Sequence, residues 1–302
     1  MVNVSTLQKK IMKHITAFII VLATLLVSCE KKTEEEQNGN IKKNAPIRKE
    51  PKSFTYSYLD AKKFKLDSLS EKELVILSGV NRMDKTFLKK ADSILVPSDL
   101  SGDIEFYLPF PFEVKALDSI EKIIFFSYPS QTFATYEYGF LTHEGPTNMG
   151  KKTAITPTGL FFTNWKAEET ISTVNEDWHL KWNFNVANKD GVGFHEYELP
   201  GYPASHSCMR LTEKDAKMLY EFANQWVVDK DGETVKVKGT PVIIFGTYDF
   251  NAPKPWFALK NDAKALAISE DELYKIISPH INTIKKEQKI RDEYLNTQKS
   301  KS

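Results

Sequence analysis

The stretch Pro203-Ala204-Ser205-His206-Ser207-Cys208-Met209-Arg210-Leu211 is the most informative part of this 302-residue sequence. The chain contains two cysteines, and the other one, Cys29, follows a signal-like segment that gives it a different role. Cys208 therefore has no partner for an internal disulfide bond. A free thiol in an exported protein is prone to oxidation, so its presence indicates a specific use.

Two histidines lie near Cys208 in the sequence and suggest that use. His206 is two positions before the cysteine and His195 is thirteen positions before it. A thiolate attacks a carbonyl carbon whereas a thiol does not, so a catalytic cysteine needs a neighbouring base. The pattern predicts nucleophilic catalysis by Cys208.

The N-terminal segment has the features of a secretory signal. Three lysines precede an apolar run from Ala17 to Val27, and the run ends at Leu26-Val27-Ser28-Cys29. A basic region, a short apolar region and small residues before the cut are typical of such signals. The ending resembles the lipobox of bacterial lipoproteins, which implies a signal peptide over residues 1–28 and a lipid on Cys29. An ordinary signal peptide with an incidental cysteine is the alternative.

Residues 29–52 are charged and contain no aromatic side chain. Such a segment cannot bury a core, so we expect a disordered tether. A lipid followed by a tether would hold a domain at a membrane surface. The expected location is the cell envelope, with the protein anchored to a bacterial membrane and its domain facing the periplasm.

The composition excludes some functions. A net charge of +1 argues against electrostatic capture of nucleic acid, and a hydrophobic content of 41% is normal for a packed core. The histidines at positions 143, 179 and 280 lack the spacing of metal ligands, so we predict no metal site and no cofactor. Nothing in the sequence indicates an oligomeric state.

The mature chain divides into three parts. Residues 53–115 contain helical patterns over 72–80 and 84–95 and form a small N-terminal helical module without a chemical motif. Residues 116–247 are the predicted catalytic domain. Residues 248–302 form a C-terminal helical tail, interrupted near Pro279.

Short β-rich segments dominate the predicted catalytic domain. They cover residues 123–128, 132–138, 139–142, 160–163, 180–186, 192–195, 235–237 and 241–245. Short strands separated by turns favour an antiparallel sandwich or barrel. One principal helix follows Cys208, with Thr212 as its N-cap and Asp215 three residues later. Trp178 and Trp182 are interpreted as core residues, with lining of a cleft as the alternative.

Three blocks occur in order along this domain: Thr156-Pro157-Thr158-Gly159, Gly193-Phe194-His195, and Ser205-His206-Ser207-Cys208-Met209-Arg210. Together they resemble the catalytic domain of the L,D-transpeptidases of the YkuD type. The resemblance extends from about Ile120 to Phe245 and implies a mainly β catalytic domain, here with α-helical N-terminal and C-terminal appendages.

The resemblance implies a role for several of these residues. Cys208 would be the nucleophile that holds an acyl group as a thioester, and His195 would accept and return its proton. The carbonyl of Glu196 would fix the tautomer of the His195 ring. The backbone N–H groups of Ser207 and Cys208 would form an oxyanion hole.

Two further residues of the motif have supporting roles under this interpretation. His206 is too close to Cys208 along the chain to move freely, so it would be a structural residue. Arg210 would reach a carboxylate of the substrate, because a guanidinium matches that geometry. The sequence departs from the family pattern at Ser207, which replaces a glycine, and at Glu196. A side chain at position 207 must adopt ordinary backbone angles or carry strain.

The implied reaction is peptidoglycan crosslinking. An L,D-transpeptidase would transfer a stem peptide from its thioester to an amine acceptor. With water as acceptor, the same thioester gives an L,D-carboxypeptidase or an amidase. A catalytically silent wall-binding lipoprotein is a third possibility, and the departure at Ser207 supports it. The predicted partners are peptidoglycan stem peptides and, through the lipid, a membrane.

Overall fold

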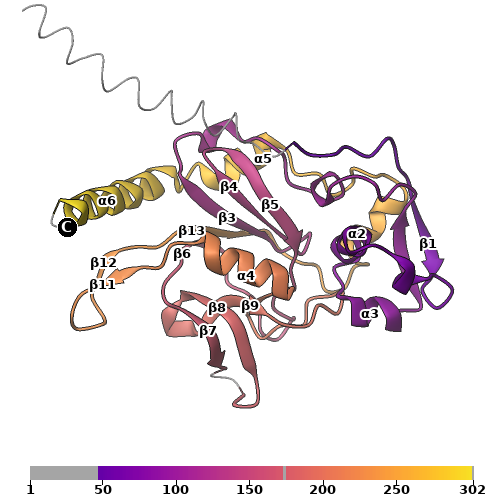
Figure 1. Ribbon diagram of the computed structural model, residues 1–302, viewed down its shortest axis with the longest axis horizontal. Helices are drawn as coiled ribbons and strands as arrows, with labels where there is room; N and C mark the ends of the chain where they lie inside the picture. Colours follow the sequence, from indigo (N-terminus) through magenta and orange to yellow (C-terminus); the bar gives the residue numbers. More distant parts are fainter. Residues whose placement is uncertain (1–46, 173–174, 301–302) are drawn as a thin grey trace, which may run out of the picture. The chain divides into compact units, whose positions relative to one another are not determined.

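A mixed β-sheet of five strands forms the centre of the protein (Figure 1). The computed structural model describes residues 47–172 and 175–300. The strand order is β5-β4-β3-β13-β6, and β3 and β13 run parallel while the other pairs are antiparallel. The strands are β3 (Lys122–Ser127), β4 (Thr132–Glu137), β5 (Phe140–Pro146), β6 (Gly159–Phe162) and β13 (Pro241–Phe245).

A second sheet, in the order β10-β9-β8-β7, lies across the core from the central sheet. Its strands are β7 (Lys166–Ile171), β8 (His179–Ala187), β9 (Val192–Glu196) and β10 (Met209–Leu211). β9 and β10 are parallel, and their register places Arg210 opposite His195. This pairing joins the motif that contains His195 to the motif that contains Cys208.

The main core lies between the two sheets and the helix α4 (Glu213–Phe222). Phe126 of the central sheet, Phe194 of the second sheet and Leu219 of α4 are all fully buried there. Thr212 caps α4, because its Oγ1 accepts a hydrogen bond from the Asp215 N–H at 3.2 Å. The capped helix after Cys208 is therefore confirmed, and it fixes the chain that leaves β10.

The opposite face of the central sheet is covered by the C-terminal helices α5 (Glu270–Ile277) and α6 (Ile281–Lys299) (Figure 1). Leu273, Ile277 and Ile284 of these helices are buried against the sheet. A capping box formed by Ser269 and Glu272 starts α5. The tail thus consists of helices interrupted near Pro279, as predicted.

The N-terminal part contains α2 (Glu71–Asn81), α3 (Lys85–Lys90) and a strand pair, β1 (Tyr56–Asp60) with β2 (Ser93–Pro97). The predicted helix over 84–95 is wrong in its second half, because Ile94 and Leu95 pair with β1. The remaining elements are β11 (Val227–Val228), β12 (Val235–Val237) and short 3₁₀ turns at Leu66–Ser68, Ile104–Phe106, Lys115–Leu117, Asn188–Asp190 and Pro255–Lys260.

The mainly β domain with its principal helix and helical C-terminal tail is confirmed. Parallel pairing within both sheets is a difference from the antiparallel pattern expected. Strands β3 and β13 are distant in sequence, so no hairpin joins them, and sequence alternation does not reveal their direction. The signal peptide, Cys29 and most of the tether lie outside the described residues. Within the described ranges, no helix is long and apolar enough to span a membrane.

Candidate active site

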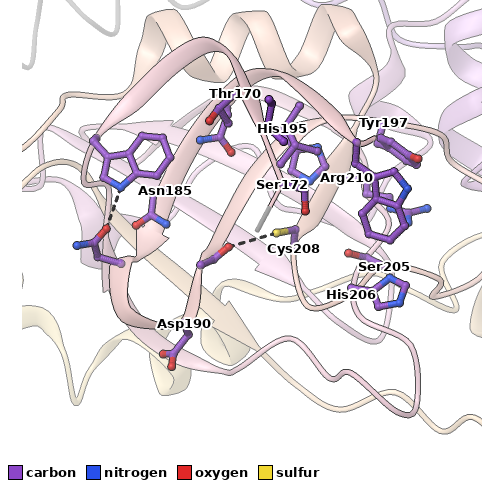
Figure 2. A pocket seen from close by; sticks show the side chains of 17 residues that line it. Thr170, Ser172, Asn185, Asp190, His195, Tyr197, Ser205, His206, Cys208 and Arg210 are labelled. Atoms are coloured by element: carbon purple, nitrogen blue, oxygen red, sulfur yellow. Dashed lines mark hydrogen bonds between the residues drawn. The ribbon is translucent and has the colours of Figure 1, made fainter. Parts of the chain in front are cut away.

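A cavity of about 310 Å³ surrounds Cys208 (Figure 2). Strands β7, β8 and β9, the turn at Asn188–Asp190 and the end of the Cys208 loop, defined as residues 202–208, line it. The structure brings His195, His206, Cys208 and Arg210 together in this cavity. Figure 2 shows Cys208 between a side with Asn185 and Asp190 and a side with Tyr197, His206 and Arg210.

Cys208 presents a free thiol to the cavity. Its Sγ donates a weak hydrogen bond to the carbonyl oxygen of Gly191 over 3.7 Å. Burial raises the pKa of the Cys208 thiol above its ordinary value. The resting side chain is therefore a thiol at neutral pH, and it needs a base to become a nucleophile.

His195 lies on β9 and is 4% exposed. Its Nδ1 and the carbonyl oxygen of Glu196 are 2.8 Å apart, which is the hydrogen bond expected from the sequence. A carbonyl only accepts, so Nδ1 carries the proton and the lone pair is on Nε2. Burial lowers the pKa of His195 to about 4, so the ring is neutral near pH 7 and able to accept a proton.

Ser207 has a left-handed backbone conformation, with φ of +80°. This region suits glycine, and a residue with a Cβ adopts it at a cost of roughly 1–3 kcal/mol. The sequence left two outcomes for Ser207, ordinary backbone angles or a strained backbone, and the structure shows the strained backbone. The conformation is retained because the chain on both sides of Ser207 is anchored.

A segment that we call the strap, residues 147–151, supplies that anchoring. Asn148 exchanges backbone hydrogen bonds with Arg210 and accepts one from the Ala204 N–H on its Oδ1 at 3.1 Å. Ser205 donates its N–H to Met149, and the Ser205 carbonyl accepts from the Lys151 N–H at 2.9 Å. The strap therefore holds the chain both before and after Cys208.

His206 is engaged by a lysine. Its Nε2 lies 2.6 Å from Nζ of Lys151, and its ring packs at 5.1 Å against Trp178. An ammonium group only donates, so the Nε2 lone pair of His206 is occupied. Burial, then the positive charges of Lys151 and Arg210, lower the pKa of His206. These contacts favour the structural role expected for His206 and leave His195 as the better base.

Arg210 lies half-buried on the same side of the cavity. Its guanidinium packs over the ring of Tyr197, 4.4 Å from the ring centre. Within the described residues, the guanidinium has no ion pair with a carboxylate. A charged group that is open to a cavity and unneutralised is suited to an anionic substrate.

Sequence reasoning missed the opposite side of the cavity. Asn183 and Asn185 are 5% and 2% exposed, yet both line it. Asn185 Oδ1 accepts from Asn164, and the Trp165 indole N–H donates to Asn188 Oδ1 at 2.8 Å. The alternation Asn183-Phe184-Asn185-Val186 was the available signal, because it places polar groups on one face of a buried strand.

The two tryptophans of this region have different environments. Trp178 lines the cavity, so its interpretation as a core residue is wrong. Trp182 packs against Tyr220 instead and does not line the cavity. Across the described parts of the chain, no group of three or more His, Cys, Asp or Glu side chains is placed to hold a metal ion.

Residues 121–244 match the family model of the L,D-transpeptidase catalytic domain, YkuD. Solved structures with similarity include an L,D-transpeptidase from Stackebrandtia nassauensis (23% identity, TM-score 0.35) and one from Mycobacterium smegmatis (19%, TM-score 0.33). Each alignment covers 42% of this chain, and 57% and 59% of those chains, respectively. No curated protein matches. The family resemblance inferred from the sequence motifs is confirmed for this domain.

Proposed function

Because residues 121–244 belong to the L,D-transpeptidase catalytic domain family, we propose that this protein is a peptidoglycan L,D-transpeptidase with Cys208 as nucleophile and His195 as general base. One observation carries the proposal. Cys208 and His195 line the same cavity, and the bond from His195 Nδ1 to the Glu196 carbonyl leaves Nε2 as the accepting nitrogen.

The first half of the reaction forms a thioester. His195 Nε2 takes the thiol proton as Cys208 Sγ attacks the carbonyl carbon of the diamino acid in a stem peptide. The new S–C bond forms and the C–N bond to the terminal D-residue breaks. The proton on His195 passes to the leaving nitrogen, which departs as a free amine. The neutral thiol and neutral imidazole of the resting site are the correct starting state for this transfer.

The second half transfers the acyl group. An amine from another stem attacks the thioester, and His195 accepts the proton that this amine loses. The S–C bond breaks, and the proton returns to sulfur. Backbone N–H groups of Ser207 and Cys208 stabilise the oxyanion in both halves under this proposal.

Product analysis tests the proposal. The purified protein is incubated with tetrapeptide muropeptides and an amine acceptor, and the products are identified by mass. Crosslinked dimers support transpeptidation, trimmed monomers indicate that water is the acceptor, and unchanged muropeptides indicate a silent wall-binding protein. Cys208→Ala is the matched control, because it removes the proposed nucleophile alone.

Covalent labelling by a carbapenem is a second test. A strained acyl compound that enters the cavity is expected to form a slowly hydrolysed thioester with Cys208. Intact mass then rises by one inhibitor, and the Cys208→Ala protein stays unlabelled. Labelling of the alanine variant would assign the acylated residue elsewhere.

The proposed location follows from the N-terminal sequence. A lipid on Cys29 and the tether over 29–52 would place the catalytic domain at the periplasmic side of the cell envelope, within reach of peptidoglycan. Cys29→Ser is expected to move the protein from the membrane fraction to the soluble fraction. Unchanged fractionation would show that the protein is anchored by other means.

A further inference from the structure

A second cation, which the proposed mechanism does not use, lies beside His206, one of the residues that line the cavity. The amine of Lys151 lies 2.6 Å from His206 Nε2. That contact uses one of its three N–H donors and leaves two for a ligand. Within the described residues, neither Lys151 nor Arg210 forms an ion pair with a carboxylate. The exposed Glu198 acts on Arg210 through space without pairing with it.

Successive contacts through three aromatic rings connect the two cations. Arg210 packs over Tyr197, whose ring centre is 6.3 Å from that of Trp178, and Trp178 lies 5.1 Å from the His206 ring beside Lys151. The two cations therefore contact different rings, Arg210 that of Tyr197 and Lys151 that of His206. Two cations on different rings suit two anionic groups on one ligand better than one shared group.

The two cations also differ in their proximity to Cys208. Burial raises the pKa of Cys208, and the positive charge of Arg210 offsets part of that rise. Burial lowers the pKa of His195, and the charge of Arg210 lowers it further. The charge of Lys151 acts on His206, together with that of Arg210, and is not among the causes of the shifts at Cys208 and His195. Arg210 is thus the cation nearer the reacting atoms, and Lys151 is the more distant one.

We infer that Lys151 determines specificity by binding a second carboxylate of the donor peptide, beyond the one held by Arg210. The inference rests on the proposed function for the identity of the donor. The terminal carboxylate of the leaving D-residue is close to the scissile bond, so it belongs at Arg210. The side-chain carboxylate of the diamino acid is more distant and belongs at Lys151.

His206 and Trp178 position this second subsite. The Nδ1 atom of His206 is buried and has no hydrogen-bond partner among the described residues. With Nε2 accepting from Lys151 and the ring packed against Trp178, His206 holds the ammonium group next to a residue that lines the cavity. Lys151 is anchored through its backbone N–H to Ser205, so its side chain starts from a fixed point.

The test uses two tetrapeptide donors that differ only in the side chain of the diamino acid, which ends in a carboxylate or a carboxamide. The full chain is expected to use the carboxylate donor with a kcat/KM about tenfold higher, because a charge-assisted hydrogen bond is lost with the amide. Lys151→Met should remove this preference, because kcat/KM should fall by about tenfold more for the carboxylate donor than for the carboxamide donor. Lys151→Arg should retain the preference.

Lys152→Met is the matched control, because it removes the same charge from the neighbouring exposed residue, whose amine lies 3.4 Å from Asn251 Oδ1. It should keep the preference. Equal loss for both donors in Lys151→Met would indicate a purely structural role and overturn the inference. An unaltered preference in that variant would overturn it as well.

Binding measurements separate this inference from the proposed chemistry. Calorimetry with the Cys208→Ala protein should show the same preference for the carboxylate peptide, and its loss when Lys151→Met is added. If this result is obtained while the parent protein forms no acyl-enzyme, the proposed function fails and the subsite stands. If neither peptide binds at millimolar concentration, the subsite is overturned.

Discussion

The strand β9 and the Cys208 loop each place a histidine in the same cavity, but the two rings differ in burial and in hydrogen bonding. On β9, His195 is almost fully buried and hydrogen-bonded through Nδ1 to a backbone carbonyl. On the loop, His206 is partly exposed and its Nε2 accepts from Lys151. His195 keeps the lone pair of Nε2 available to accept a proton, whereas the Nε2 lone pair of His206 already accepts a hydrogen bond from Lys151.

The difference shows that sequence distance from a nucleophile does not select its base. His206 is nearer to Cys208 along the chain, but parallel pairing of β9 with β10 brings His195 beside the motif in space. A rigid strand also fixes a side chain more closely than a loop does. The following variants test whether the two histidines differ as their surroundings suggest.

The largest effect is expected from Cys208→Ala. Turnover of muropeptides should fall to background, because no other thiol is present in the described residues. The thermal midpoint should change little, since the replaced side chain is small. Full turnover by this variant would contradict the assignment of the nucleophile and with it the comparison of the two histidines.

His195→Gln should lower the rate of acylation by roughly 10²–10⁴-fold, the usual contribution of a general base. The amide can still donate to the Glu196 carbonyl but cannot take the thiol proton. Single-turnover carbapenem labelling followed by mass measures this rate. An unchanged rate would make His206 the next candidate.

The same residue predicts a pH-dependent stability. The pKa of His195 is about 4 in the folded protein and 6.5 without perturbation. Between these values the unfolded chain binds the proton and the folded one does not, so stability falls as pH drops from 6.5 to 4. The difference corresponds to about 3 kcal/mol. Urea unfolding at both pH values should show this loss in the parent and not in His195→Gln. Equal losses in both proteins would argue against a buried neutral His195.

His206→Phe should change the acylation rate by less than about tenfold. The phenyl ring keeps the packing against Trp178 and removes the contact with Lys151. The expected change is therefore in KM for the carboxylate donor, with kcat largely retained. A fall in kcat as large as that of His195→Gln would remove the distinction between the two rings.

Ser207→Gly should have the smallest effect. Glycine accepts φ of +80° without strain, but it also gains freedom in the unfolded chain. We expect a gain in stability of no more than about 1 kcal/mol, because these two contributions oppose each other. Ser207→Ala, which keeps the Cβ, should show no gain. A lower stability for the glycine variant would mean that the serine hydroxyl contributes more than the strain costs.

Several features followed from the sequence by local rules. Thr212 with Asp215 gave the start of α4, and the helical tail was interrupted near Pro279, because capping and proline act over a few residues. The motif around Cys208 indicated the family and the bond from His195 to Glu196. The helix expected over 84–95 was wrong in its second half because pairing of β2 with β1 overrode local propensity.

The sequence by itself determined which residues carry the chemistry: a single unpaired thiol, a histidine in a β-rich block, and an arginine two positions beyond the cysteine. Only the tertiary structure decided how they are used. The parallel pair β9–β10, the strap and the pairing of His206 with Lys151 join residues far apart along the chain. Burial sets the charge states of Cys208 and His195, and burial depends on the packing of two whole sheets, which no local pattern of residues specifies.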